Sequence, residues 1–251
     1  MTLEVRDNLG ERYPDVLTPE AMTAMAALAS FEEERRAVMD ARIARRARRA
    51  RDRERIAFLD PGLVIPGSEI RVQDARDGRF VGSEIPPDLE RQWLQGTGPG
   101  AKPNAPVGKS IRNVAYALLS GADGWMFDGE DALGQVTSMS LDNQRNLKLA
   151  IAKDSLFLEV AEHVAGEMNR WGEDFFGHRI IDDWSEQLDF TTKIFRARGL
   201  HLDDRHLRSA DGSGFSASIV DLVLYVVNNY RRLAESGASI VLYLPKIQTA
   251  E

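Results

Sequence analysis

The chain has 251 residues, of which 43% are hydrophobic and 28% are charged, and its formal net charge is -7. This composition is typical of a soluble globular protein with one large domain or two small ones. Cysteine is absent, which excludes disulfides, thiolate metal sites and cysteine nucleophiles, and the acidic balance argues against nucleic acid as a partner. No apolar run reaches the roughly 18 residues that span a bilayer, and the first residues lack the layout of a signal peptide. We therefore expect a cytoplasmic protein with no membrane contact.

Residues 1–59 are predicted to form an N-terminal helical segment. Thr18 suits a helix cap and Pro19 suits the first helical position, and the following residues up to Ala57 contain no Gly or Pro. This pattern predicts one long helix, or two helices with a bend. Its second half is rich in arginine: Arg42, Arg45, Arg46, Arg48, Arg49, Arg51, Arg53 and Arg55. Such a helix could bind RNA or a partner, but without interleaved aromatics a solvated helix facing acidic surface is favoured.

Residues 60–107 are predicted to form a loop-rich connector with short strands, because Pro and Gly recur there without sustained periodicity. The tripeptide Gly108-Lys109-Ser110 resembles the end of a phosphate-binding P-loop. The motif also requires Gly at position 103, which is Pro103, so we reject it. The run from Gly96 to Gly100 likewise fails the dinucleotide-binding pattern and is interpreted as a turn.

Residues 108–251 alternate between helical and strand patterns. We predict helices at 110–120, 141–153, 156–171 and 219–235, and strands at 124–128, 191–198 and 239–244. Helices between successive strands predict a parallel sheet, and hence an α/β fold. The alternation fits either an α/β sheet or a β/α barrel, and with about three strands such a barrel would be incomplete.

Each predicted strand delivers charge at its C-terminal end. The first ends in the carboxylates Asp128, Glu130 and Asp131, the second in Arg196 and Arg198, and the third in Lys246. Crowded carboxylates need cations nearby, so a divalent metal or the two arginines could complete the acidic turn. An ordinary acidic turn is equally compatible with these residues. The four histidines, at positions 163, 178, 201 and 206, do not have a metal-binding spacing.

In combination, the motifs of this chain resemble those of malate synthase. The matching stretches are Leu17–Ala21, Ile85–Leu89 with Thr97–Pro99, Trp125–Asp131, Arg196–Leu202 and Tyr243–Thr249. Of these, Arg-Ala-Arg-Gly-Leu-His-Leu and Tyr-Leu-Pro-Lys-Ile-Gln-Thr are specific when they occur in this order. The chain is similar to the N-terminal portion of the family, within the malate synthase and citrate lyase beta-like TIM barrel superfamily.

The resemblance implies an acyltransferase of the glyoxylate bypass. The family condenses acetyl-CoA with glyoxylate and water to give malate and CoA, and uses Mg²⁺ to polarise the glyoxylate aldehyde. Arg196 stands where the family has its catalytic arginine. Asp128, Glu130 and Asp131 stand where it places acidic residues around the metal, and Arg198 and Lys246 are expected in the same environment. These residue types suit the chemistry, because an enolate needs positive charge in a dry site.

The departures from the family limit what the resemblance implies. Its direct metal ligands and catalytic aspartate come from later strands, so we expect no direct metal ligand in this chain and an incomplete, inactive portion of the enzyme. Two alternatives stay open. One is a lyase that cleaves malyl-CoA or citryl-CoA thioesters, and the other is a non-catalytic truncated paralogue. The sequence does not predict an oligomeric state.

Overall fold

The computed structural model of the chain describes residues 3–97, 105–130 and 138–247. Two compact units can be distinguished, Met1–Glu32 with Pro87–Lys246 and Glu33–Pro86 with Ile247–Glu251. The first unit contains residues from each of the three segments expected from the sequence, 1–59, 60–107 and 108–251. The boundaries of those segments stay a prediction.

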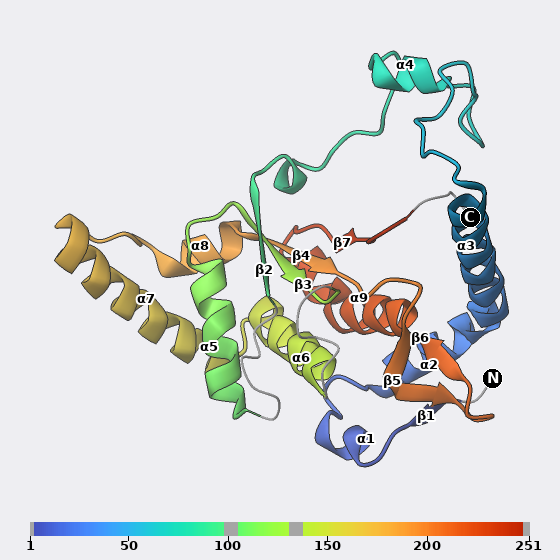
Figure 1. The fold of residues 1–251 in the computed structure, drawn as a ribbon. Helices are drawn as coiled ribbons and strands as arrows, with labels where there is room; N and C mark the ends of the chain where they lie inside the picture. Colours follow the sequence, from blue (N-terminus) through green and yellow to red (C-terminus); the bar gives the residue numbers. More distant parts are fainter. Residues whose placement is uncertain (1–2, 98–104, 131–137, 248–251) are drawn as a thin grey trace. The chain divides into compact units, whose positions relative to one another are not determined.

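A four-stranded parallel sheet runs through the first unit in the order β2-β3-β4-β7 (Figure 1). Its strands are β2 (Trp93–Thr97), β3 (Gly124–Asp128), β4 (Thr192–Arg196) and β7 (Val241–Tyr243). The predicted fold class, an α/β protein with part of a β/α barrel, is confirmed. The described sheet has one strand more than expected because β2, from the loop-rich segment, joins its edge.

Helices connect the parallel strands, as the alternating pattern predicts. Between β2 and β3 lies α5 (Val107–Leu118), and between β3 and β4 lie α6 (Met139–Ala152), α7 (Ser155–Phe176) and α8 (Trp184–Phe190). Helix α9 (Ala217–Glu235) precedes β7. The side chain of Asp154 caps α7, and Gly177 ends it in the left-handed conformation with a φ of 76°. This is the conformation in which glycine carries no steric penalty.

The main core lies between this sheet and its helices. Ile111 of α5, Phe127 of β3 and Phe157 of α7 are buried in one cluster with Phe195 of β4 and Tyr225 of α9. The rings of Phe195 and Tyr225 are stacked, with centroids 5.3 Å apart. This contact fixes α9 against β4 and so places the first turn of α9 beside the C-terminal end of that strand.

The N-terminal residues form two helices and not one long helix. Helix α2 (Pro19–Leu28) begins after Thr18, whose hydroxyl accepts a hydrogen bond from the Ala21 amide at 3.3 Å. A 3₁₀ turn, η1 (Ala29–Phe31), separates α2 from α3 (Glu32–Asp52). Buried apolar residues of α2 pack in a second cluster with residues of α9, and both helices belong to the first unit.

A small antiparallel sheet in the order β1-β5-β6 was not predicted from the sequence. It consists of β1 (Leu3–Val5), β5 (Asp203–Ser209) and β6 (Gly214–Ser216). Strand β5 reads Asp-Asp-Arg-His-Leu-Arg-Ser, so its sequence lacks the apolar alternation that indicates a strand. Pairing with β1 and β6 stabilises it instead. The helices α1 (Leu9–Arg12) and η2 (Pro87–Leu89) complete the first unit.

The second unit contains most of α3 and the short helix α4 (Val72–Arg76). An antiparallel bridge joins Val64 to Arg71 within it. The arginines of α3 are exposed or partly buried, and their role stays a prediction. Among the described residues, no helix is long and apolar enough to cross a membrane.

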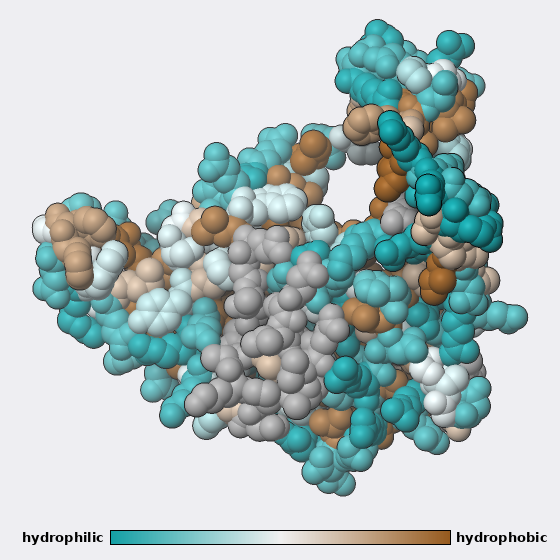
Figure 2. All heavy atoms as spheres, viewed as in Figure 1, coloured by the Kyte–Doolittle hydropathy of each residue, from teal (hydrophilic) through white to brown (hydrophobic). Residues whose placement is uncertain are grey.

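Apolar side chains gather at the free end of α7 (Figure 2, left). Trp171, Phe175 and Phe176 are exposed there, and the Trp171 ring lies 5.1 and 5.2 Å from the two phenylalanine rings. The earlier turns of the same helix bury Phe157 and Val164 in the main core. The helix is therefore held by these earlier turns, while its last turns carry an aromatic cluster toward solvent.

Candidate functional site

Two carboxylates lie at the C-terminal end of β3, where the sequence predicts them. Asp128 is the last residue of the strand, and its side chain accepts a hydrogen bond of 2.9 Å from the Glu130 amide. Both residues are buried. Gly129 between them donates its amide to the Arg196 carbonyl at 3.0 Å, and a Cβ atom at this position would lie 2.7 Å from that oxygen. Glycine therefore allows the acidic turn to approach β4 closely.

Arg196 meets both carboxylates from the neighbouring strand. The register of the sheet aligns Asp128 with Arg196 and Arg196 with Tyr243. The guanidinium donates to the Asp128 carboxylate at 3.1 Å and to the Glu130 carboxylate at 2.8 Å. It also lies 5.5 Å from the centre of the Tyr243 ring, within the range of a cation–π contact. Tyr243 belongs to the matching stretch Tyr243–Thr249 but is not among the predicted site residues. Its position directly before Leu-Pro-Lys could have indicated that it lies beside the site.

Lys246 completes this cluster from the turn after β7. Its ammonium donates to the second oxygen of the Glu130 carboxylate at 2.5 Å, while 43% of its side chain is exposed. Glu130 thus bridges a buried arginine and a partly exposed lysine. The structure brings Asp128, Glu130, Arg196 and Lys246 together, as the sequence predicts, and their roles in binding or catalysis stay a prediction.

Arg198 belongs to a different cluster. Its guanidinium donates to Asp221 of α9 at 2.7 and 2.9 Å and to Asp204 of β5 at 2.7 Å, and its backbone amide donates to Asp221 at 2.8 Å. All three side chains are buried. Burial alone would lower the pKa of this guanidinium, but the two carboxylates outweigh it and hold the pKa above its usual range.

The separation of the two arginines has a simple cause. Strand β4 ends at Arg196, so the alternation that would place both arginines on one face no longer applies at Arg198. Asp204 and Asp221 were missed by sequence reasoning. Asp221 had a detectable signal, because it is a single carboxylate in the otherwise apolar start of α9, between Ile219 and Tyr225. A buried carboxylate of this kind requires a cation nearby.

The metal environment expected at the acidic turn comprises Asp128, Glu130 and Asp131. Asp131 lies outside the described residues. Within the described ranges, no group of three or more His, Asp or Glu side chains could hold a metal ion. Asp128 and Glu130 direct their oxygens at Arg196 and Lys246, so this arrangement does not fit a magnesium ion by itself. Of the histidines, His163 pairs with Glu167 at 3.0 Å and His206 is buried in β5.

The fold and this cluster define a class of protein. Parallel β/α strands with buried, opposite charges gathered at their C-terminal edge are the arrangement of TIM-barrel proteins, whose sites lie at that edge.

Comparison with known proteins shows which family the chain resembles. The model of the malate synthase TIM barrel domain matches residues 192–251. The glyoxysomal malate synthase of Brassica napus is 29% identical over 251 residues, which cover 98% of this chain and 38% of the relative. The malate synthases of Streptomyces clavuligerus and Myxococcus xanthus are each 28% identical to this chain. The first match covers 95% of this chain and 38% of the relative, and the second covers 94% and 37%. The predicted resemblance to the N-terminal portion of malate synthase is thereby confirmed. The chain spans less than two fifths of the length of these relatives.

Proposed function

We propose that this chain contributes to a malate synthase-like acyltransferase, which condenses acetyl-CoA with glyoxylate and water to give malate and CoA. The observation that carries the proposal is the contact of Arg196 with Asp128 and Glu130 at the C-terminal edge of the sheet. It is supported by similarity to malate synthases along nearly the whole chain. A cytoplasmic location is part of the proposal, although the Brassica napus relative is glyoxysomal.

Arg196 has the properties that such a reaction needs at its carbonyl substrates. Arginine stays protonated at any physiological pH and can bind a carboxylate through two parallel hydrogen bonds. In this proposal, the glyoxylate carboxylate and the enolate that forms from the acetyl group are both stabilised by Arg196. Glu130 and Asp128 hold the guanidinium in position before substrate binds, which lowers the cost of orienting it.

Lys246 has a supporting role in this proposal. Its ammonium shares Glu130 with Arg196 and reaches it from a partly exposed position. A partly exposed lysine beside the site can attract anionic substrates and can release Glu130 when they bind. Arg198, in contrast, is assigned to holding α9 and β5 against the end of β4.

Magnesium is proposed as the cofactor of the complete active site, where it would polarise the glyoxylate aldehyde. Asp128 and Glu130 are engaged with cations, so direct ligands from other residues are required. We assign the two carboxylates to the surroundings of the metal, through hydrogen bonds or bound water.

We also propose that residues 1–251 do not catalyse turnover by themselves. The four described parallel strands are fewer than a closed (β/α)8 barrel requires, so the site has only part of its wall. The catalytic base is likewise assigned to residues outside the described cluster, since Asp128 and Glu130 are neutralised by Arg196 and Lys246.

Thiol release from acetyl-CoA in the presence of glyoxylate tests this function. The assay should be run on the 251-residue polypeptide and on the product of the longest reading frame that contains it, with and without Mg²⁺. We expect thiol release and malate only from a longer product with a complete barrel. Malate formed by the 251 residues alone would overturn the proposal of an incomplete site. Cleavage of malyl-CoA without condensation would identify the lyase alternative instead.

A further inference from the structure

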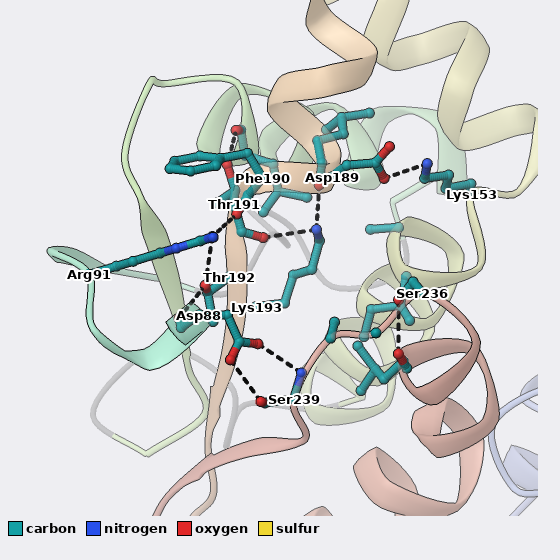
Figure 3. Close-up of a pocket in the computed structure, with 17 residues that line it drawn as sticks. Asp88, Arg91, Lys153, Asp189, Phe190, Thr191, Thr192, Lys193, Ser236 and Ser239 are labelled. Atoms are coloured by element: carbon teal, nitrogen blue, oxygen red, sulfur yellow. Dashed lines mark hydrogen bonds and ion pairs between the residues drawn. The ribbon is translucent and has the colours of Figure 1, made fainter. Parts of the chain in front are cut away.

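A hollow of about 510 Å³ lies at the opposite edge of the sheet, beside the N-terminal ends of β4 and β7. Figure 3 shows Lys193 extending from β4 into this hollow, with the end of α8 on one side and Ser239 on another. Its volume is within the range of about 300–1,000 Å³ that is typical of small-molecule sites. The hollow lies at the N-terminal ends of the strands, whereas the Arg196 cluster occupies the C-terminal ends of the same strands.

The Lys193 ammonium has an unusual environment. Lys193 and Ile194 point to opposite faces of β4, and Ile194 is fully buried. The ammonium donates to the carbonyl oxygens of Leu188 and, at 2.9 Å, Thr191. No carboxylate of the described residues lies within ion-pair distance of it. Burial therefore lowers the pKa of this amine from 10.5 to about 8.

The other charges of the hollow leave it with an excess of positive charge. Asp189 forms an ion pair with Lys153. Asp88 accepts two hydrogen bonds of 2.8 Å, from the amide and the hydroxyl of Ser239. Arg91 donates to the carbonyl of Phe190, and its guanidinium lies 4.1 Å from the centre of that ring. Three cations thus face two carboxylates, and both carboxylates are already engaged.

Helix capping explains only part of this arrangement. Leu188 and Thr191 lie at the end of α8, where carbonyl groups lack partners within the helix, and a lysine can satisfy them. That role accounts for two of the three ammonium hydrogens. It does not account for the hollow in front of the ammonium or for the excess charge around it.

We propose that this hollow binds a small molecule that carries a carboxylate or phosphate group, with Lys193 as the direct contact of its oxyanion. The third ammonium hydrogen is available for an anion, and a charge-assisted hydrogen bond in a desolvated place is among the stronger polar contacts. Arg91 adds positive charge at the rim, while the charge of Lys153 is offset by Asp189. The apolar walls from Leu118, Ile151 and Leu233 suit the rest of a small organic ligand.

Isothermal titration calorimetry on the 251-residue protein at pH 7 tests this proposal. Inorganic phosphate is the phosphate probe and succinate is the carboxylate probe, so the two arms distinguish the sources of the oxyanion. We expect saturable binding of at least one probe, and a loss of affinity of about tenfold or more in Lys193→Met, because one charge-assisted contact is removed. Lys148→Met is the matched control, since Lys148 also donates to a backbone carbonyl, that of Asp15, and should leave binding unchanged.

Three outcomes would overturn the proposal. They are no saturable binding of either probe, equal affinities in the wild type and Lys193→Met, and equal losses in Lys193→Met and Lys148→Met. If Lys193→Met does not fold, Arg91→Gln is used in its place, with an expected loss of affinity of several-fold. Affinity for succinate, which is a dianion throughout this range, should also fall as the pH rises from 7 to 9, since the amine then loses its charge. Constant affinity over that range would count against Lys193 as the contact.

Discussion

At the scale of single residues, the strongest electrostatic feature of the chain is the buried cluster of Arg198, Asp204 and Asp221. The two carboxylates offset the burial of one guanidinium, and Asp221 also accepts the Arg198 backbone amide. Removing one partner of such a buried cluster leaves an uncompensated charge in the interior. The cluster therefore links β4, β5 and α9 only as long as every member is present.

Asp221→Asn is expected to lower the free energy of unfolding by about 3–5 kcal/mol, because Arg198 stays buried with less negative charge around it. Urea denaturation measures the effect. Glu235→Gln is the control, since the ion pair of Glu235 with Arg232 is exposed and its loss should cost at most about 1 kcal/mol. Similar losses in the two variants would show that the buried cluster contributes no more than a surface pair.

Lys193 predicts a specific dependence of stability on pH. Its pKa is lowered from 10.5 to about 8 in the folded protein, so between these values the unfolded state binds more protons than the folded state. The free energy of unfolding contributed by this residue should therefore rise with pH across that window, by at most about 3 kcal/mol. Thermal or urea denaturation of the wild type and Lys193→Met at pH 7.5 and pH 10 measures it. An unchanged difference between the two proteins would contradict the lowered pKa.

At the scale of secondary-structure elements, local sequence signals fix the ends of the helices that hold the sheet. The Asp154 carboxylate accepts a hydrogen bond of 3.0 Å from the Leu156 amide and so caps α7.

Asp154→Ala is expected to lower the free energy of unfolding by about 1 kcal/mol. Asp174→Ala, in the last turns of the same helix, is the control and should be neutral or slightly stabilising, because it removes negative charge near the helix C-terminus. Chemical denaturation compares the two, and a larger loss in Asp174→Ala would be inconsistent with capping.

The elements that could be predicted are those with strong local signals. Strand β3 was predicted at 124–128 and has those bounds, and α9 differs from its prediction by two residues at its start. Strand β2 was expected only as one of the unplaced short strands of residues 60–107, and the polar strand β5 was not expected, because both pair with strands distant in sequence. Pairing of this kind is a tertiary effect that a local pattern does not contain.

In the candidate site, too, some residues could be predicted from local sequence and others could not. The parallel register brings Asp128 beside Arg196, and this could be predicted because both residues end apolar strands. The partners of Arg198 could not, since they depend on how β5 and α9 fold back onto the end of β4. Lys193 was not singled out either, because its importance comes from the surrounding hollow and not from its neighbours in the sequence.

At the scale of the whole molecule, the first unit places charged residues at both edges of one parallel sheet. The C-terminal edge holds Arg196 between Asp128 and Glu130, and the N-terminal edge holds Lys193 beside the hollow. We propose that the first edge binds glyoxylate and that the second edge binds another anion. The two sites should therefore respond to different substitutions.

In the proposed function, Arg196 binds glyoxylate directly. The most direct measurement is titration of glyoxylate into the 251-residue protein with Lys193→Met, which removes the other anion site, followed by the same titration after adding Arg196→Lys. We predict saturable binding in the first protein and a loss of affinity of about tenfold or more in the second, because lysine cannot make the two-point contact. Arg232→Lys, at an exposed position in α9, is the control and should have no effect. Equal affinities for glyoxylate with arginine and with lysine at position 196 would contradict the account.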